Sequence, residues 1–107
     1  MKITRNMIYR PSDAATELTL FAVNEHSEYE RFRGVVSSLS RKMRKGIYDP
    51  QKAVISYYHA VTQAAKVYDV MYGNPFRRST FTVTDRWTAA TDLEEYFREN
   101  VEELATA

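Results

Sequence analysis

Residues 49–73 read "DPQKAVISYYHAVTQAAKVYDVMYG" and contain the strongest helix signals of the chain. Asp49 is a typical helix N-cap and Pro50 suits the first helical position, so the pair predicts a helix start. The Gly-Asn-Pro sequence at residues 73–75 prevents the helix from continuing. The stretch therefore predicts one long, uninterrupted helix.

The apolar residues of this helix cover about half of its circumference, at about 100° per residue. A stripe that wide needs more than one neighbouring element, so we expect this helix to be the central one. The apolar positions are Ala53, Val54, Tyr57, Tyr58, Ala60, Val61, Ala64, Ala65, Tyr68 and Met71.

Two helices are predicted before it. The first covers residues 12–24. The second covers residues 27–45, where Ser27 and Glu30 have the spacing of a capping box and Gly46 is placed to close the helix in the left-handed conformation. Gly34 interrupts this second helix, which suggests a close approach of another helix, either within the fold or between subunits. The apolar stripe of the second helix is narrow and consists of Tyr29, Phe32, Val36, Leu39 and Met43.

A fourth helix is predicted to start with Thr84 or Asp85 as its cap. Its apolar face carries Trp87, Ala90, Leu93, Phe97, Val101 and Leu104, and its acids Asp92, Glu95, Glu99, Glu102 and Glu103 lie mostly on the opposite face. Ahead of it, the alternation at Phe81 and Val83 favours a minor short strand near residues 80–83, paired with residues 7–9. The predicted fold class is all-α: one domain, residues 1–107, forming a compact four-helix bundle-like arrangement around the long central helix.

The composition excludes several classes of protein. The chain has 107 residues, and 44% hydrophobic with 27% charged residues is typical of a folded globule. It has no cysteine, which excludes disulfides, thiolate metal sites and a cysteine nucleophile. The N-terminus lacks the apolar run of a signal peptide, and no stretch approaches the roughly 20 apolar residues of a membrane span. We expect a cytoplasmic protein that does not contact the membrane.

The charges are unevenly distributed along the chain. Residues 1–83 carry 13 basic and 7 acidic side chains, whereas residues 84–107 carry 2 and 7. Such a division suggests internal charge pairing or an electrostatically oriented encounter with a partner.

The end of the second helix carries a basic cluster formed by Arg41, Lys42, Arg44 and Lys45. Clustered cations are typical of nucleic-acid or other anionic-partner binding, and Arg77 and Arg78 extend the cluster if the fold brings them close. Cations in a last helical turn also complement the helix dipole without any partner. The short turn "GIYD" at 46–49 fits a helix-turn-helix, but the long flanking helices fit an antiparallel helical hairpin equally well.

Tyrosine is abundant, with 8 residues in the chain. Tyr57, Tyr58, Tyr68 and Tyr72 all lie on the central helix and are the candidate residues of a protein interface, because tyrosine is favoured at binding hot spots. The alternative is an amphipathic edge of the core with hydroxyl groups that reach water.

No constellation of catalytic residues stands out. Glu95, Glu99 and Glu102 share one side of the fourth helix, but a charge run on a helix is usually a solvated face, and Arg98 has ion-pair spacing from Glu94 and Glu102. His26 and His59 each lack a second ligand at metal-binding spacing. Three glycines cannot build a phosphate-binding loop. We expect no enzyme activity, no cofactor and no metal.

Three segments carry a resemblance to a known group of proteins: "LSRKMRKGIYDPQKAV" at 39–54, "AAKVYDVMYG" at 64–73 and "FTVTDRWTAATDLEEYFRENV" at 81–101. In the pattern and order of these segments the chain resembles small, uncharacterised, all-helical proteins encoded by bacteriophages and prophages. The resemblance covers roughly residues 9–104 and implies a setting, a phage or mobile-element protein in a bacterial cytoplasm.

The expected function is that of a non-enzymatic binding protein that engages a host or anti-phage defence protein. The alternative is a nucleic-acid-binding protein that uses the basic end of the second helix. A homodimer is also expected, because a small bundle gains core by pairing. The favoured contact is the apolar Tyr/Ala/Val strip of the central helix, and the alternative is the acidic fourth helix of one copy against the basic end of the second helix of the other.

Overall fold

The computed structural model describes residues 14–73 and 79–106, with side-chain burial as far as residue 103. Four helices follow one another along the chain: α1 (Ala14–Asn24), α2 (His26–Arg44), α3 (Pro50–Tyr72) and α4 (Val83–Thr106). Each helix contacts the other three, and α3 and α4 pack against each other most extensively. Within the described ranges the chain contains no strand. The predicted all-α, four-helix fold is confirmed.

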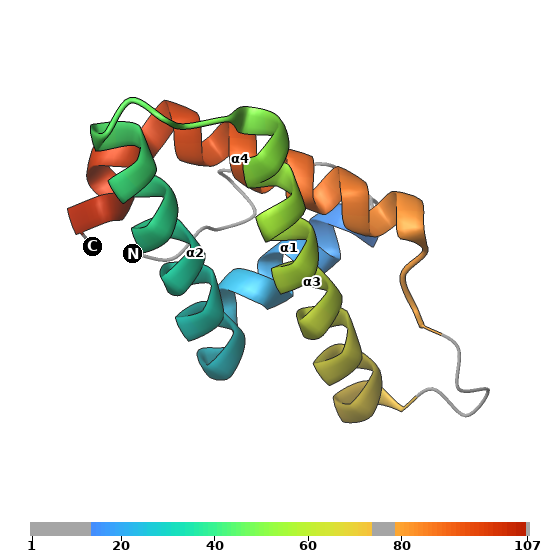
Figure 1. Ribbon diagram of the computed structural model, residues 1–107. Helices are drawn as coiled ribbons and strands as arrows, with labels where there is room; N and C mark the ends of the chain where they lie inside the picture. Colours follow the sequence, from blue (N-terminus) through green and yellow to red (C-terminus); the bar gives the residue numbers. More distant parts are fainter. Residues whose placement is uncertain (1–13, 74–78, 107) are drawn as a thin grey trace.

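Helices α2 and α3 lie side by side and antiparallel, and α4 crosses them, as Figure 1 shows. The start of α3 is the predicted one, because the Asp49 side chain accepts a hydrogen bond from the Gln51 backbone N–H at 3.0 Å. The turn before it forms as expected at Gly46, whose φ of 71° is in the left-handed region that favours glycine. The Ile47 N–H donates to the Lys42 carbonyl at 3.0 Å and closes α2.

The predicted capping box at the start of α2 is wrong. Helix α2 begins at His26, so Ser27 lies inside the helix and its hydroxyl donates to Glu28 Oε2 at 3.0 Å instead. Glu25 is the single residue between α1 and α2. Its N–H donates to the Phe21 carbonyl, and its own carbonyl accepts from the Tyr29 N–H. This tight connection leaves no room for a separate cap residue two positions later.

The predicted strand near residues 80–83 is also wrong, because the chain forms a capping box there. The Asp85 N–H donates to Thr82 Oγ1 and the Thr82 N–H donates to Asp85 Oδ2, both at 3.0 Å. This reciprocal pair turns the backbone into α4 at Val83, and Thr82 takes the cap position assigned to Thr84 or Asp85. The partner expected for the strand, residues 7–9, lies outside the described residues.

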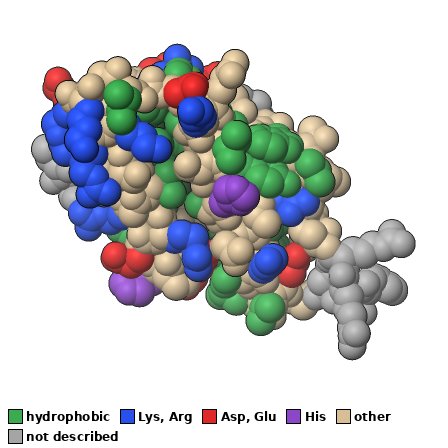
Figure 2. Space-filling model, viewed as in Figure 1, with side chains coloured by type: hydrophobic (Ala, Val, Ile, Leu, Met, Phe, Trp, Pro, Cys, Tyr) green, Lys and Arg blue, Asp and Glu red, His purple; other side chains and the backbone are tan. Residues whose placement is uncertain are grey.

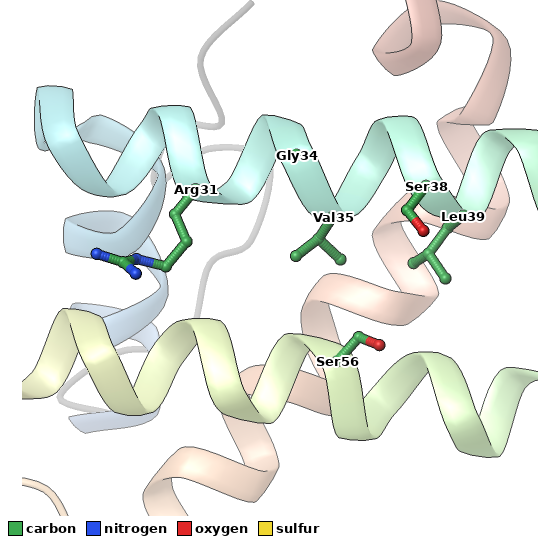
Figure 3. A pocket seen from close by; sticks show the side chains of 6 residues that line it. All are labelled: Arg31, Gly34, Val35, Ser38, Leu39 and Ser56. Atoms are coloured by element: carbon green, nitrogen blue, oxygen red, sulfur yellow. The ribbon is translucent and has the colours of Figure 1, made fainter.

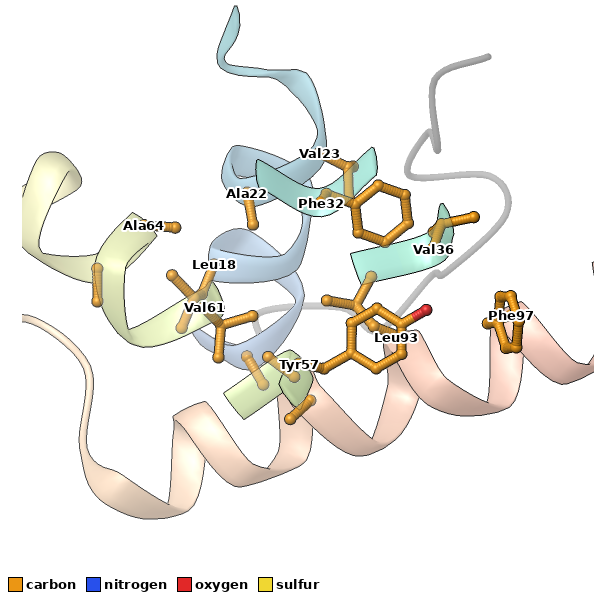
Figure 4. Packing of buried hydrophobic residues seen from close by; sticks show 14 of the residues in the cluster. Leu18, Ala22, Val23, Phe32, Val36, Tyr57, Val61, Ala64, Leu93 and Phe97 are labelled. Carbon is orange, nitrogen blue, oxygen red and sulfur yellow. The ribbon is translucent and has the colours of Figure 1, made fainter. Parts of the chain in front are cut away.

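One hydrophobic core runs through all four helices (Figure 4). The predicted core face of α3 is confirmed for most positions, but Met71, at 51% exposure, is not part of it. On α4 the acid Asp92 is buried, contrary to the solvated face expected for it. None of the helices in the described part of the chain combines the length and the hydropathy of a membrane span. The largest fully buried apolar side chains are Tyr57, Phe97, Leu18, Leu93, Val23 and Val61.

Candidate functional site

An aromatic pair lies on the surface where α3 and α4 meet. The rings of Tyr58 and Trp87 are stacked, with centroids 4.0 Å apart and planes inclined by 19°. Tyr58 is half-buried at the edge of the core face of α3, and Trp87 is one turn into α4 and 39% exposed. The sequence assigned Trp87 to the core, and the structure places it at the rim of the core instead.

Polar aromatic and cationic groups surround this pair. The His59 ring meets Tyr58 edge to face at a centroid distance of 6.2 Å. The Arg86 guanidinium lies 5.6 Å from the centre of the Tyr58 ring, within the range of a cation–π contact. Both groups extend the pair along the surface.

Exposed aliphatic residues continue the same surface. Ile55 precedes Tyr58 by three residues and Val83 precedes Trp87 by four, spacings that place each beside its aromatic neighbour on one helix face. They are 47% and 53% exposed. We call the surface formed by Ile55, Tyr58, His59, Val83, Arg86 and Trp87 the aromatic patch. Figure 2 shows hydrophobic side chains gathered on the face of α3 and α4, with a histidine beside them.

The other two tyrosines predicted for an interface lie at the far end of α3. Tyr68 is half-buried and makes ring contacts with Phe21 of α1 and with Phe81, so it holds the core together at this end. Tyr72 is 64% exposed and packs on Tyr68 at a centroid distance of 4.6 Å. Neither residue contacts the Tyr58–Trp87 pair through its ring, so the four tyrosines do not form one surface.

Tyr57 cannot belong to an interface, and its prediction as an interface residue is wrong. Its side chain is fully buried, with its ring 6.0 Å from that of Phe32. The directions of the Tyr57 and Tyr58 side chains differ by about 100° around the helix axis. Tyr57 therefore points into the core, whereas Tyr58 lies at the edge of the core face. Burial raises the pKa of the Tyr57 hydroxyl above its ordinary value, because the ionised form loses its hydration.

A buried carboxylate anchors the turn between α2 and α3 to α4. Glu94 is 2% exposed, and its Oε1 accepts a hydrogen bond from the Tyr48 hydroxyl at 3.0 Å. Arg98 Nε lies 2.7 Å from Oε1 and 2.9 Å from Oε2, which confirms the predicted pairing of Arg98 with Glu94. Burial raises the pKa of Tyr48 most, and the hydrogen bond to Glu94 raises it further. The burial of Glu94 was not predictable from local sequence, because its partner Tyr48 is 46 residues away.

The remaining acids of α4 form no metal site that the structure describes. Glu95 and Glu99 are exposed. In residues 14–73 and 79–106, no group of three or more His, Cys, Asp or Glu side chains is placed to hold a metal ion.

The basic cluster is exposed at the carboxyl end of α2. Arg41, Lys42, Arg44 and Lys45 all have solvated side chains, and none makes an ion pair with an acidic side chain of the described part of the chain. Figure 2 shows Lys and Arg side chains concentrated on the side of the molecule where α2 lies. The predicted extension by Arg77 and Arg78 lies outside the described residues.

A shallow groove of about 300 Å³ separates α2 from α3 (Figure 3). An added Cβ at Gly34 would meet no atom of the described residues within 4 Å, so this part of the fold does not form the close helix approach predicted at this glycine. The groove contains none of the residues of the aromatic patch. Its lining consists of Arg31, Gly34, Val35, Ser38, Leu39 and Ser56.

Comparisons with protein-family models, curated proteins and solved structures find no match to this chain. The aromatic patch and the basic cluster are the two candidate binding surfaces of the described residues.

Proposed function

We propose that the chain is a non-enzymatic protein-binding domain and that the aromatic patch is its interface. The observation that carries this proposal is the stacked Tyr58–Trp87 pair at the surface, flanked by exposed Ile55 and Val83. Tryptophan and tyrosine are enriched at the centres of protein interfaces, where a few aromatic anchors supply most of the binding energy.

The two rings are already ordered before a partner binds. Their mutual stacking and their attachment to two packed helices fix both side chains, so that binding loses little side-chain entropy. Their hydroxyl and indole N–H edges provide polar groups that can pair with a partner while the ring surfaces are covered. A preformed apolar surface with polar edges is suited to a protein partner.

The resemblance to phage and prophage proteins makes a bacterial host or defence protein the expected class of partner. A second copy of the chain is the other protein that the patch would meet at high concentration. Binding of a host or defence protein gives a complex of two different chains, whereas binding of a second copy gives the expected homodimer. Measurement of the molecular mass of the complex distinguishes the two.

Capture of a partner from bacterial lysate tests the proposal when it is done with paired variants. Ile55→Asp introduces a charge into the aromatic patch, whereas Ile47→Asp introduces the same charge at another exposed isoleucine, in the turn after α2. We expect a protein retained by the wild-type chain to be retained by the Ile47 variant and lost by the Ile55 variant. Equal retention by all three would show that the patch is not the interface.

A second candidate function, nucleic-acid binding, rests on the four exposed cations of the basic cluster. They lack described acidic partners and so remain available to phosphates. This function requires affinity that falls steeply with salt, because each neutralised phosphate releases counterions. Replacement of Arg41, Lys42, Arg44 and Lys45 by alanine should then weaken binding to unrelated sequences by a similar factor, and unchanged binding would remove this candidate.

A further inference from the structure

The exposed side of α3 carries cations on both sides of the aromatic patch. Lys52 precedes Ile55 by three residues, and Lys66 follows His59 by seven, so all four lie on one face of the helix. All four side chains are exposed. Neither lysine makes an ion pair with an acidic side chain among the described residues.

Three acids lie near these cations, Asp49, Asp69 and Asp85, and the carboxylate of each accepts a hydrogen bond from a backbone N–H. The one acid within α3 is Asp69, whose carboxylate accepts a hydrogen bond from the Thr80 backbone N–H at 2.9 Å. The side of the patch formed by α4 contributes a further cation, Arg86, which lies over Tyr58. The apolar centre is therefore flanked by Lys52, Lys66 and Arg86, and neither lysine makes an ion pair with a described acidic side chain.

We propose that the aromatic patch binds an acidic segment of a partner protein, in which apolar side chains lie between carboxylate groups. Lys52 and Lys66 are separated by 14 residues of helix, so the two carboxylate groups of the partner that pair with them would lie about 20 Å apart. The inference rests on the proposed function and adds the chemistry of the partner. Charge complementarity of this kind selects the partner and raises the association rate.

The same charges disfavour a second copy as the occupant. A symmetric dimer joins identical surfaces, so pairing through this face of α3 would bring the cations of one copy against the cations of the other. Single-stranded nucleic acid fits the charge but not the rings. Tyr58 and Trp87 already cover one face of each other's ring, so those faces are not available to a base, and the exposed aliphatic side chains of Ile55 and Val83 add no stacking surface.

Trp87 is the only tryptophan in the chain, so its fluorescence reports binding at the patch. The probe is an acidic copolymer of glutamate and tyrosine, compared with polyglutamate, with a basic copolymer of lysine and tyrosine, and with oligo-dT. We expect the acidic copolymer to shift the Trp87 emission saturably and to bind more tightly than polyglutamate. We expect no response to the basic copolymer.

Two double variants with the same change in net charge provide the control. Lys52→Glu with Lys66→Glu should weaken binding of the acidic copolymer by about tenfold or more, from the loss and reversal of two charge pairs. Lys42→Glu with Lys45→Glu changes the basic cluster instead and should weaken it by less than about twofold, because these side chains are not on the patch.

Four results would overturn the inference: no response to the acidic copolymer, equal losses in the two double variants, an equal response to oligo-dT, or a Trp87 shift caused by protein concentration alone. Absence of the copolymer response, combined with loss of the captured partner in the Ile55→Asp variant, would reject the acidic segment and keep the patch as the interface. Retention of the partner by that variant would reject the interface itself.

Discussion

Replacement of Tyr48 by phenylalanine tests how the turn between α2 and α3 is held on α4. The substitution keeps the ring, which lies 5.8 Å from that of Phe97, and removes only the hydroxyl. That hydroxyl donates at 3.0 Å to Glu94, whose side chain is 2% exposed and so has almost no access to replacement water. Hydrogen bonds to charged groups contribute about 1.5–3 kcal/mol, so we expect a loss of about 2 kcal/mol in the free energy of unfolding.

Urea unfolding followed by circular dichroism measures this loss. A change of about 2 kcal/mol corresponds to a fall of about 10 °C in Tm for a domain of this size. Tyr72→Phe is the matched control, because Tyr72 is 64% exposed and makes no hydrogen bond that the structure describes. It should change the stability by less than about 0.5 kcal/mol. If Tyr48→Phe also changed the stability by less than about 0.5 kcal/mol, the hydrogen bond to Glu94 would not anchor the turn to α4.

Three further predictions concern the fold. Gly34→Ala should stabilise the protein by about 0.5–1 kcal/mol, because the site is helical and open. Gly46→Ala should destabilise it by a similar amount, because φ is 71° at this position. Thermal unfolding of both variants measures the two changes. Thr82→Ala should cost about 1 kcal/mol by removing the cap of α4, and Thr84→Ala, one residue inside the helix, should cost less; equal effects would contradict the capping box. Tyr48 and Tyr57 have raised pKa values, so the unfolded chain loses these protons first and stability should decline as pH rises above about 10. This alkaline decline should be smaller in the Tyr57→Phe variant when unfolding is measured across that pH range, and an unchanged decline would count against the burial of the hydroxyl.

The helices that begin and end with strong local signals were predictable from the sequence. Asp49, Pro50 and Gly46 act on backbone groups within a few residues of themselves, so no knowledge of the fold is needed to interpret them. Residues 80–83 were not predictable in the same way. Two alternating apolar residues are too few to distinguish a strand from a helix cap. In the structure, the reciprocal hydrogen bonds of Thr82 and Asp85 cap helix α4 at this point.

The candidate site was only partly predictable. Tyr58 was a predicted interface residue, but so was its neighbour Tyr57, which the structure buries. When apolar residues cover half of a helix, the sequence does not show which residues at the edge of that half are buried. Consecutive residues differ by about 100° around the helix, so Tyr57 can lie in the core while Tyr58 reaches the surface. The pairing of Tyr58 with Trp87 depends on where α4 crosses α3, which no local pattern specifies.

The contribution of Trp87 to the affinity for a captured protein partner measures whether the aromatic patch is the interface. Trp87→Ala removes one ring of the stacked pair, and truncation of an aromatic hot spot typically costs about 2 kcal/mol or more, which corresponds to a rise of roughly 30-fold in Kd. Calorimetric titration of the purified partner should show this rise for Trp87→Ala and less than about a twofold change for Tyr72→Ala, at a temperature where circular dichroism shows both variants folded. An unchanged Kd for a folded Trp87→Ala variant would contradict the assignment of the aromatic patch as the interface.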